Sequence, residues 1–402
     1  MSGIAWTVQH AYEGSEFFRQ KLDRAGVDHR AVHRVEDLAR LPLTTKAELR
    51  DSYPFGWTCV PLADVVRLHA STGTTGRRVV ATYTAQDLAD WAEMFARCFE
   101  YARVTRADRV QVTPGYGLWT AGIGFQAGVE RLGAMAVPTG PGNLELQFEA
   151  LLDLQTTVLC ATSSFGLLVA EEAHRRGLVE RLALRVGVFG AERWGAAMRR
   201  RIEELLGIET FDIYGFTELY GPGTGIDCPE HEGIHYWDDF YVIEVIDPES
   251  EAAVPPGEPG ELVVTTLRKQ AQPLLRYRTH DLSRLIPEPC RCGSPYPRID
   301  RISGRSDDMF KVRGVQVYPA QIDTALSGIP GLSSEYQVVL SREAGRERFL
   351  VRVEAEPERD VEEVVADELR RRLGVRPEVE VVAVGTLPRT DRKTRRVFDD
   401  RD

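Results

Sequence analysis

The sequence predicts an α/β protein with a large N-terminal domain, and two patterns carry that prediction. Between residues 65 and 285, short runs rich in β-branched residues alternate with longer stretches of helical character. Such alternation favours mostly parallel sheets whose faces are covered by helices. After the Pro/Gly-rich turn at 256–260 the chain becomes β-rich from 261 to 266, which indicates a β-rich subdomain within the same domain.

The boundaries of the individual elements follow from the same patterns. Strands are expected at 109–113, 134–138, 157–161 and 182–189, and helices at 120–132, 144–154 and 197–206. Residues 1–64 have the character of helices and turns, and Thr45 with Glu48 three residues later predicts a capped helix start. Open α/β sheets bind ligands beyond the carboxyl ends of their strands, where the loops at 116–118, 190–192 and 214–218 fall.

The pattern changes again beyond Asp307. Strand-like segments at 338–340 and 349–353, a charged helix at 361–373 and a strand at 379–384 predict a small α+β C-terminal domain. We therefore expect two domains, residues 1–306 and 307–402.

Composition limits the classes of partner. Lys and Arg number 50 against 61 Asp and Glu, giving a net charge of −11, which argues against non-specific binding to nucleic acid or to an anionic membrane. No apolar run approaches the roughly 20 residues of a membrane span. The N-terminus lacks the basic and apolar regions of a signal peptide, and the six cysteines are unevenly spaced, unlike a disulfide framework. We expect a cytoplasmic protein.

A short hydroxyl-rich loop is the first candidate site. Ser71, Thr72, Gly73, Thr74, Thr75, Gly76 and Arg77 lie between β-branched runs at 65–66 and 79–83, as in a hairpin. Main-chain N–H groups and hydroxyls in such a turn can point into one concavity and hold a phosphate. The loop differs from a P-loop, which has a Lys-Ser/Thr end leading into a helix. Taken alone, it is equally well an ordinary surface loop.

Further motifs follow in a fixed order downstream. They are Phe211–Glu218, Tyr277–Asp281 and Gly304–Asp308, together with the phrases Tyr53–Gly56, Tyr116–Leu118, Gly221–Gly223 and Asp307–Met309. In this order, and with the 71–77 loop, they resemble the signatures of the adenylate-forming superfamily, and most closely its phenylacetate–coenzyme A ligase branch. The resemblance extends from about Ala11 to the C-terminus.

The resemblance implies an ATP and AMP site. Its expected residues are Ser71, Thr72, Gly73, Thr74, Thr75, Gly76, Arg77, Glu192, Asp212, Tyr214, Gly215, Asp281 and Arg305. The loop would hold the β- and γ-phosphates, Tyr214 would flank the adenine, and Asp281 and Arg305 would bind the ribose hydroxyls. Arg77 departs from the family, which usually has Lys there, and it is also compatible with a solvated hairpin residue.

Three residues are expected to serve catalysis. Glu218 would supply an oxygen ligand to Mg²⁺, which typically takes one or two carboxylates together with phosphate oxygens. Thr217 would contact the α-phosphate, and Lys393 would neutralise charge between the carboxylate and the α-phosphorus. Locally, the neighbouring arginines also allow Lys393 to be part of a solvated basic tail.

The resemblance also implies an acid pocket and a mobile C-terminal lid. The pocket would be formed by Tyr116, Gly117, Leu118, Trp119, Phe165, Ala191 and Gly215, whose aromatic and apolar walls suit an aryl or arylacetic acid. The lid would rotate between half-reactions with Asp307 as its hinge. Gly314 would then allow the thiol arm of coenzyme A to approach.

Cysteine and histidine spacing predicts a structural zinc site. Cys228 is followed by His231 and His235, and the Cys290-Arg291-Cys292 knuckle lies further along the chain. Three thiolates and one imidazole form a closed zinc set, and either histidine could complete it. Free cysteines near a hairpin are the alternative.

These observations favour an ATP-dependent ligase that converts a benzoic or arylacetic acid to its acyl-adenylate, releases pyrophosphate and transfers the acyl group to coenzyme A. The expected cofactors are ATP, Mg²⁺, coenzyme A and Zn²⁺, and the family suggests a homodimer. One alternative transfers the acyl group to an amine, a hydroxyl or a carrier protein. The other is a degenerate nucleotide-binding protein, against which the retention of Glu218, Asp281, Arg305 and Lys393 argues.

Overall fold

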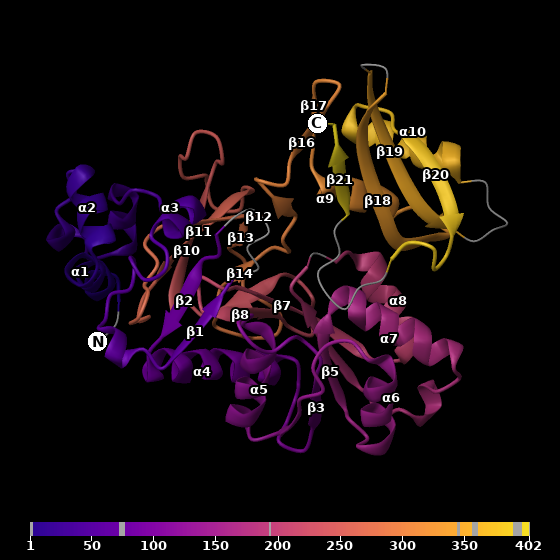
Figure 1. Cartoon of the computed structure of the whole chain (residues 1–402), viewed down its shortest axis with the longest axis horizontal. Coiled ribbons are helices and arrows are strands. Elements are labelled where there is room, and N and C mark those ends of the chain that lie inside the picture. Colours follow the sequence, from indigo (N-terminus) through magenta and orange to yellow (C-terminus); the bar gives the residue numbers. More distant parts are fainter. Residues whose placement is uncertain are drawn as a thin grey trace. The chain divides into compact units, whose positions relative to one another are not determined.

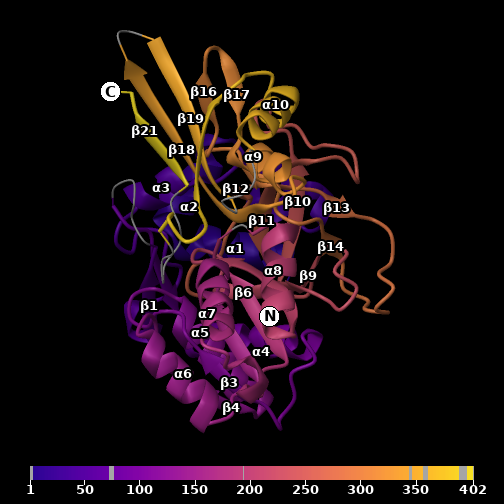
Figure 2. The ribbon, with the colours of Figure 1, turned by 90° about the vertical axis from the view of Figure 1, so that its right-hand side faces the viewer.

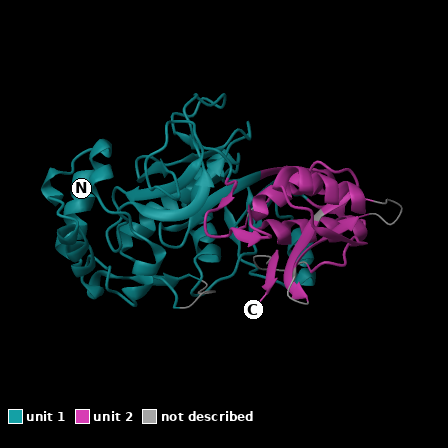
Figure 3. Ribbon diagram, turned by 90° about the horizontal axis from the view of Figure 1, so that it is seen from above, with its two compact units in different colours: residues 1–161, 183–191, 211–301 teal, residues 162–182, 192–210, 302–402 magenta. Residues whose placement is uncertain are grey.

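The structure is a computed structural model, which describes residues 3–71, 77–192, 194–343, 346–355, 361–388 and 396–401. The chain forms two compact units, coloured separately in Figure 3. Unit 1 contains residues 1–161, 183–191 and 211–301, and unit 2 contains 162–182, 192–210 and 302–402. Because unit 2 takes two segments from the first three hundred residues, the division at 306/307 stays a prediction.

The largest sheet among the described residues has nine strands, in the order β13-β14-β9-β8-β7-β6-β5-β3-β4 (Figure 1). Strand β3 pairs in parallel with both β4 and β5, whereas β7, β8, β9, β14 and β13 pair antiparallel in succession. The strands are β3 (Arg109–Val112), β4 (Met135–Val137), β5 (Val158–Thr162), β6 (Val186–Gly190), β7 (Glu209–Phe216), β8 (Gly221–Asp227), β9 (Ile234–Tyr236), β13 (Leu285–Ile286) and β14 (Arg298–Ile299). The strands β3, β4 and β5 lie where the β-branched runs predicted them, and β6 covers only the second half of its predicted run at 182–189.

Two helices of unit 1 pack against each other and against β8. They are α4 (Ala85–Tyr101) and α5 (Ala121–Leu132). Helix α4 begins at a capping box and buries an aromatic stripe that includes Trp91 and Phe95. The glycines of α5 allow this approach, since a Cβ at Gly124 would lie 2.3 Å from the Trp91 ring and one at Gly128 2.5 Å from the Phe95 Cβ. A Gly/Ala-rich helix is therefore required where it faces large aromatic rings.

The rest of unit 1 surrounds a second, antiparallel sheet, in which β11 pairs with β10 on one side and β12 on the other. A separate hairpin joins β1 to β2, with Ala70 opposite Val80. The bounds are β1 (Arg67–Ala70), β2 (Val80–Tyr83), β10 (Tyr241–Ile246), β11 (Gly260–Thr266), β12 (Tyr277–Ser283), α1 (Ile4–Gly14), α2 (Glu16–Arg24), α3 (Lys46–Asp51) and α6 (Leu144–Asp153). The β-rich subdomain predicted after residue 256 is thus present.

Unit 2 combines two helices of the central chain with the C-terminal α+β domain. Its sheet has the order β20-β19-β18-β21, with β18 and β19 antiparallel and both outer strands parallel to their neighbours. The elements are α7 (Ser163–Arg175), α8 (Ala196–Leu206), β15 (Gly304–Arg305), β16 (Phe310–Val312), β17 (Val315–Val317), α9 (Pro319–Leu326), β18 (Leu332–Glu343), β19 (Arg346–Ala355), α10 (Glu362–Leu373), β20 (Glu378–Ala383) and β21 (Val397–Asp400).

Apolar side chains on one face of this sheet pack against the two C-terminal helices, which Figure 2 shows beside it. Val338, Phe349 and Val351 of the sheet share one buried core with Ile322 of α9 and Leu369 of α10. The predicted small α+β domain is confirmed. No helix in the described ranges is long and apolar enough to cross a membrane.

Candidate functional site

The turn after β7 carries Thr217 and Glu218, and it is held by buried donors. The Tyr83 hydroxyl donates to the main-chain oxygen of Tyr220 at 2.7 Å. The Lys269 ammonium donates to the main-chain oxygen of Glu218 at 2.8 Å. Leu219 N–H closes the turn onto the Phe216 carbonyl at 3.1 Å. The carbonyl groups of Phe216, Glu218 and Tyr220 in this turn are therefore already bonded.

The Glu218 side chain is a buried carboxylate, only 2% exposed. The Lys46 ammonium lies 3.0 Å from Glu218 Oε1 and is the cation that offsets its charge. Lys46 is the first residue of α3, which Thr45 and Glu48 cap reciprocally, as the sequence predicted. A buried carboxylate needs such a partner, because an isolated charge in the interior costs several kcal/mol.

Lys269 is a second cation at this turn and, unlike Lys46, is fully buried. Its side chain is fully buried, and its ammonium lies over the Tyr83 and Tyr220 rings at 5.2 and 5.1 Å. Burial lowers the pKa of Lys269 to about 8, against the opposing effect of Asp87 and Glu218. Asp87 is also fully buried and accepts the N–H groups of Gln270 and Ala271, which follow Lys269. The segment that carries Lys269 is thus fixed by its own main chain.

Two of the predicted nucleotide residues contact each other. The Tyr214 hydroxyl donates to Asp281 Oδ2 at 2.9 Å, joining β7 to β12. Tyr214 is buried, whereas Asp281 is partly accessible. Gly215 follows with a φ of +148°, and a Cβ there would lie 2.2 Å from the Gly221 carbonyl oxygen. Only glycine allows β8 to pass this close.

Most of the predicted phosphate loop, residues 72–76, lies outside the described residues. Its two ends are described. The Ser71 hydroxyl accepts the Val79 N–H at 3.0 Å, and Ser71 N–H donates to the Val79 carbonyl at 2.9 Å, so the loop is closed at its base. The Arg77 guanidinium lies over the Tyr53 ring at 5.9 Å.

The predicted acid-pocket segment 116–119 adjoins the strand that leads into this loop. The Leu118 carbonyl accepts the Ala70 N–H at 2.8 Å and lies 3.3 Å from Nδ1 of His69. Tyr116, Gly117 and Leu118 are exposed, and Trp119 is half-buried. A main-chain hydrogen bond therefore joins β1, the strand before the predicted phosphate loop, to the predicted pocket segment.

The other predicted pocket residues come from separate segments. Ala191 is exposed with a φ of +68°, and Phe165 is buried in α7. Glu192, predicted to bind nucleotide, accepts bonds from the Ser164 N–H at 2.7 Å and the Ser163 hydroxyl at 3.1 Å. In this arrangement its carboxylate caps the start of α7.

Asp212 and Arg305, both predicted to bind nucleotide, lie in different units. Asp212 is partly buried on β7, and its N–H donates to Asp227 Oδ1 at 2.8 Å. Arg305 forms a bidentate ion pair with Asp307, the predicted hinge, with bonds of 2.8 and 3.0 Å. Two residues predicted for different tasks thus contact each other.

Gly314, the predicted coenzyme A position, is in the tight turn between β16 and β17. Its φ is +80°, and a Cβ built on it would meet nothing within 4 Å. The predicted catalytic Lys393 lies outside the described residues.

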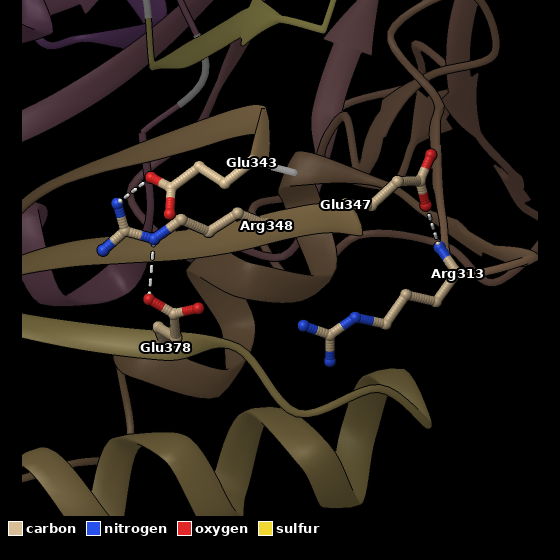
Figure 4. A pocket seen from close by; sticks show the side chains of 5 residues that line it. All are labelled: Arg313, Glu343, Glu347, Arg348 and Glu378. Atoms are coloured by element: carbon tan, nitrogen blue, oxygen red, sulfur yellow. Dashed lines mark hydrogen bonds and ion pairs between the residues drawn. The ribbon is translucent and has the colours of Figure 1, made fainter. Parts of the chain in front are cut away.

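A cavity of about 550 Å³ lies beside this turn, and Figure 4 shows its five lining residues. Arg348 bonds to both Glu343 and Glu378, and the main-chain N–H of Arg313 donates to Glu347. Three carboxylates against two guanidinium groups make this cavity a poor site for a phosphate, so we assign it none.

The cysteine and histidine residues converge as one cluster. The ligand atoms of Cys228, His235, Cys290 and Cys292 all lie within 4.8 Å of one another. Cys228 Sγ lies 3.6 Å from Cys290 Sγ, and Cys292 Sγ 3.5 Å from His235 Nε2. His235 Nδ1 lies 3.0 Å from the Tyr296 carbonyl, which leaves Nε2 toward the sulfur atoms.

His231, the other predicted candidate, is not part of this cluster. It has a φ of +52°, and its Nδ1 lies 3.0 Å from Asp227 Oδ2. The structure thus distinguishes two histidines that the spacing left equivalent.

Sequence reasoning missed Lys46, Tyr83 and Lys269, although all three contact the Thr217–Glu218 turn. Lys46 was visible only as part of a capped helix start, and Tyr83 only as a strand residue. Lys269 lies eight residues before the Tyr277 motif, in a polar stretch that carries no motif of its own.

Comparison with known proteins places this geometry in a family. A family model described as "AMP-binding enzyme" matches residues 21–267, and one described as "AMP-binding enzyme C-terminal domain" matches residues 314–401. The chain belongs to the AMP-binding enzymes. The resemblance identified from the motifs is confirmed, as is the predicted class of AMP-forming acid–thiol ligase.

Particular relatives refine this comparison. The chain is 41% identical to a phenylacetate-coenzyme A ligase of Escherichia coli, over 98% of this chain and 93% of the relative. It is also 41% identical to a protein of the same name from Thermus thermophilus, with coverage of 98% and 94%. A crystal structure of 2-hydroxyisobutyryl-CoA ligase in the postadenylation state, in complex with 2-HIB-AMP, matches with a TM-score of 0.90 at 30% identity, covering 99% of this chain and 88% of that one.

Proposed function

We propose that this protein activates an aromatic carboxylic acid, of the benzoic or arylacetic type, and transfers it to coenzyme A. The acid's carboxylate oxygen attacks the α-phosphorus of ATP, and the bond to the leaving pyrophosphate breaks. The thiolate of coenzyme A then attacks the acyl carbon, and AMP leaves. The observation that carries the proposal is the buried Glu218 turn beside the Tyr214–Asp281 pair, in a chain related throughout to phenylacetate-coenzyme A ligases.

The residues of the chain fit the first half-reaction. Asp281, oriented by the Tyr214 hydroxyl, has a partly accessible carboxylate that can accept bonds from ribose hydroxyls. Thr217 offers a hydroxyl on a turn whose backbone is fixed by Tyr83 and Lys269. Fixed donors of this kind reduce the reorganisation that charge development requires. We assign to Lys393 the positive charge that neutralises the negative charge between the carboxylate and the α-phosphorus.

Glu218 fits a magnesium ligand, because it is a hard oxygen donor held at one position by its buried turn. When bound, Mg²⁺ would neutralise charge on the phosphates of ATP.

The cysteine cluster fits zinc. Cys228, Cys290 and Cys292 with His235 supply the three sulfur and one nitrogen ligands of a closed structural site. The Tyr296 carbonyl beside His235 Nδ1 is the outer partner that orients such a ligand. We therefore propose a structural Zn²⁺ that links β9 to the 290–292 knuckle.

Metal analysis tests the zinc proposal. Purified protein should contain about one equivalent of zinc, and Cys290→Ser should lose it, whereas Cys160→Ala, at a buried cysteine outside the cluster, should retain it. The site would be disproved if purified wild-type protein contained no zinc and its melting temperature did not change when zinc was added.

We further propose that residues 307–402 form the mobile lid, hinged at Asp307. Two observations support this. The Arg305–Asp307 ion pair is exposed, so a rotation at Asp307 could break it and let Arg305 take another partner. The turn at Gly314 has no atom within 4 Å of a Cβ built there. The family model for the C-terminal domain begins at residue 314. Cytoplasmic location and a homodimer stay predictions.

The assay for the activity is acid-dependent release of pyrophosphate over benzoates, phenylacetates, aminobenzoates, hydroxybenzoates and short aliphatic hydroxy acids. Each acid is tested with coenzyme A, with hydroxylamine and with no acceptor, and Lys393→Ala is the control. An aryl acid that gives a thioester supports the proposal. Adenylate without thioester would instead assign another acceptor, and preference for an aliphatic hydroxy acid would overturn the aromatic class.

A further inference from the structure

Among the described contacts, Lys46 forms an ion pair with the Glu218 carboxylate itself, whereas Lys269 bonds the main-chain oxygen of Glu218. The mechanism above gives Lys46 no task. Its ammonium lies 3.0 Å from Glu218 Oε1, and 30% of its side chain is exposed. The Glu218 side chain is almost fully buried. The ion pair therefore joins a buried carboxylate to a lysine side chain that is partly exposed to solvent.

The backbone that carries Lys46 is anchored to the nucleotide strand. The Thr44 N–H donates to the Arg276 carbonyl at 2.9 Å, and the Arg278 N–H donates to the Thr44 carbonyl at 2.8 Å. The Thr44 hydroxyl also donates to the Leu275 carbonyl at 2.7 Å. These bonds fix residue 44 beside the start of β12, the strand that carries Asp281, so the position from which Lys46 extends is set by the site itself.

The same short segment also reaches the phosphate loop. Helix α3 ends at Asp51, and Tyr53, two residues later, lies under the Arg77 guanidinium. The start of α3 thus contacts Glu218, and the residues after it contact the end of the 71–77 loop. The segment from Lys46 to Tyr53 therefore contacts two residues, Glu218 and Arg77, that were predicted to bind magnesium and the terminal phosphates.

Charge determines what happens to Lys46 when the site is loaded. A Mg²⁺ ion held by the Glu218 carboxylate would repel the Lys46 ammonium, which lies 3.0 Å from Oε1 of the same side chain. The divalent ion would then replace Lys46 as the partner that offsets the charge of the Glu218 carboxylate. The flexible four-carbon stem of lysine allows the ammonium to move to the nearest anion, which is then a phosphate oxygen.

We propose that Lys46 binds the β- and γ-phosphates of ATP, and that its ion pair with Glu218 is the nucleotide-free position of this phosphate-binding side chain. The inference rests on the proposed function, since it takes ATP as the ligand and Glu218 as the magnesium ligand. It adds a residue on α3 to the ATP site, far in the chain from the motifs that identified that site.

Calorimetric binding of nucleotides, without any acid substrate, tests this proposal. Lys46→Met keeps the stem and removes the charge, and Lys46→Arg keeps a cation. Lys21→Met is the matched control, because Lys21 also pairs with a glutamate of α3, Glu48, at 2.5 Å, and its contacts within the described residues do not include a predicted nucleotide-binding residue. Melting temperature is recorded for each variant, so that loss of folded protein is recognised separately.

With Mg²⁺ present, Lys46→Met should weaken ATP binding about tenfold or more, the usual loss for a charged hydrogen bond. AMP binding should change less than twofold, since AMP lacks the two terminal phosphates. Lys46→Arg should recover part of the affinity, and Lys21→Met should leave both nucleotides unaffected.

Unchanged ATP affinity in Lys46→Met, or equal weakening of ATP and AMP, would overturn the assignment while wild-type pyrophosphate release still upheld the proposed function. Wild-type protein that binds neither nucleotide would overturn both.

Discussion

Replacing Lys269 by methionine should change how the stability of the protein depends on pH. Lys269 is fully buried, and burial lowers its pKa from 10.5 to about 8. Between these values the folded state has lost the proton and the unfolded state still holds it. Because the unfolded state then binds more protons, the free energy of unfolding of the wild type rises with pH across this window.

The magnitude follows from the two pKa values. At roughly 1.4 kcal/mol per pKa unit, the difference between 10.5 and about 8 corresponds to about 3 kcal/mol of stability. Below pH 8 both states carry the charge, so the wild type bears the full cost of burying it. Methionine has a similar length and no charge. The variant therefore does not bear the free-energy cost of burying a charge at low pH and gains no stability from deprotonation at high pH.

The assay is urea unfolding of wild type and Lys269→Met at pH 7, 8, 9 and 10, followed by tryptophan fluorescence. The difference between the two unfolding free energies removes the contribution of the other titrating groups. This difference should move in favour of the wild type by about 2–3 kcal/mol between pH 7 and pH 10. A difference that stays constant over this range, or moves the other way, would refute a buried ammonium beneath the Glu218 turn.

Three further predictions concern the nucleotide site and the sheet. Tyr214→Phe removes the 2.9 Å bond to Asp281 and should raise the KM for ATP about tenfold with little change in the KM of the acid; equal changes in both would contradict it. Gly215→Ala places a Cβ 2.2 Å from a main-chain oxygen of β8 and should lower the melting temperature by several degrees, whereas wild-type stability would show that the strands can separate. Burial acts to raise the pKa of Asp108, but bonds from Arg185 and neighbouring groups outweigh burial and lower this pKa to about 2. The stability that these bonds contribute is therefore present above about pH 4 and is lost as the pH falls from about 4 to 2. Asp108→Asn should flatten that acid-side loss in thermal melts, and an unchanged acid profile would count against the ion pair.

The elements predicted best are those whose pattern depends on local sequence. Helices α5, α6 and α8 begin and end within about two residues of the predicted boundaries, because a helix is defined by contacts three and four residues apart. The predicted strand at 182–189 begins later, at Val186, since a short 3₁₀ turn at Val179–Arg181 and an irregular stretch come first. Where a strand begins depends on its neighbours in the sheet, which the local pattern does not contain.

The cluster of Cys228, His235, Cys290 and Cys292 shows what local sequence does not determine. His231 and His235 are both close to Cys228 in the chain, so spacing alone left them equivalent. His235 lies on β9, opposite Ile226 of β8 and Arg298 of β14, and this register directs its ring toward the cysteines. His231 lies in the preceding turn with a positive φ and contacts Asp227 instead. Strand register is a property of three segments together, so no single one of them specifies it.

By itself, the sequence determined the fold class, the family and the order of the nucleotide motifs, because hydrophobic periodicity and short motifs are written in consecutive residues. Only the tertiary structure decided which distant side chains support those motifs. Lys46 on Glu218, and Lys269 and Tyr83 under the Thr217–Glu218 turn, come from segments that have no sequence relation to the turn. A buried carboxylate and buried carbonyl groups must each find a partner, but where that partner lies in the chain is set by how the sheets and helices pack.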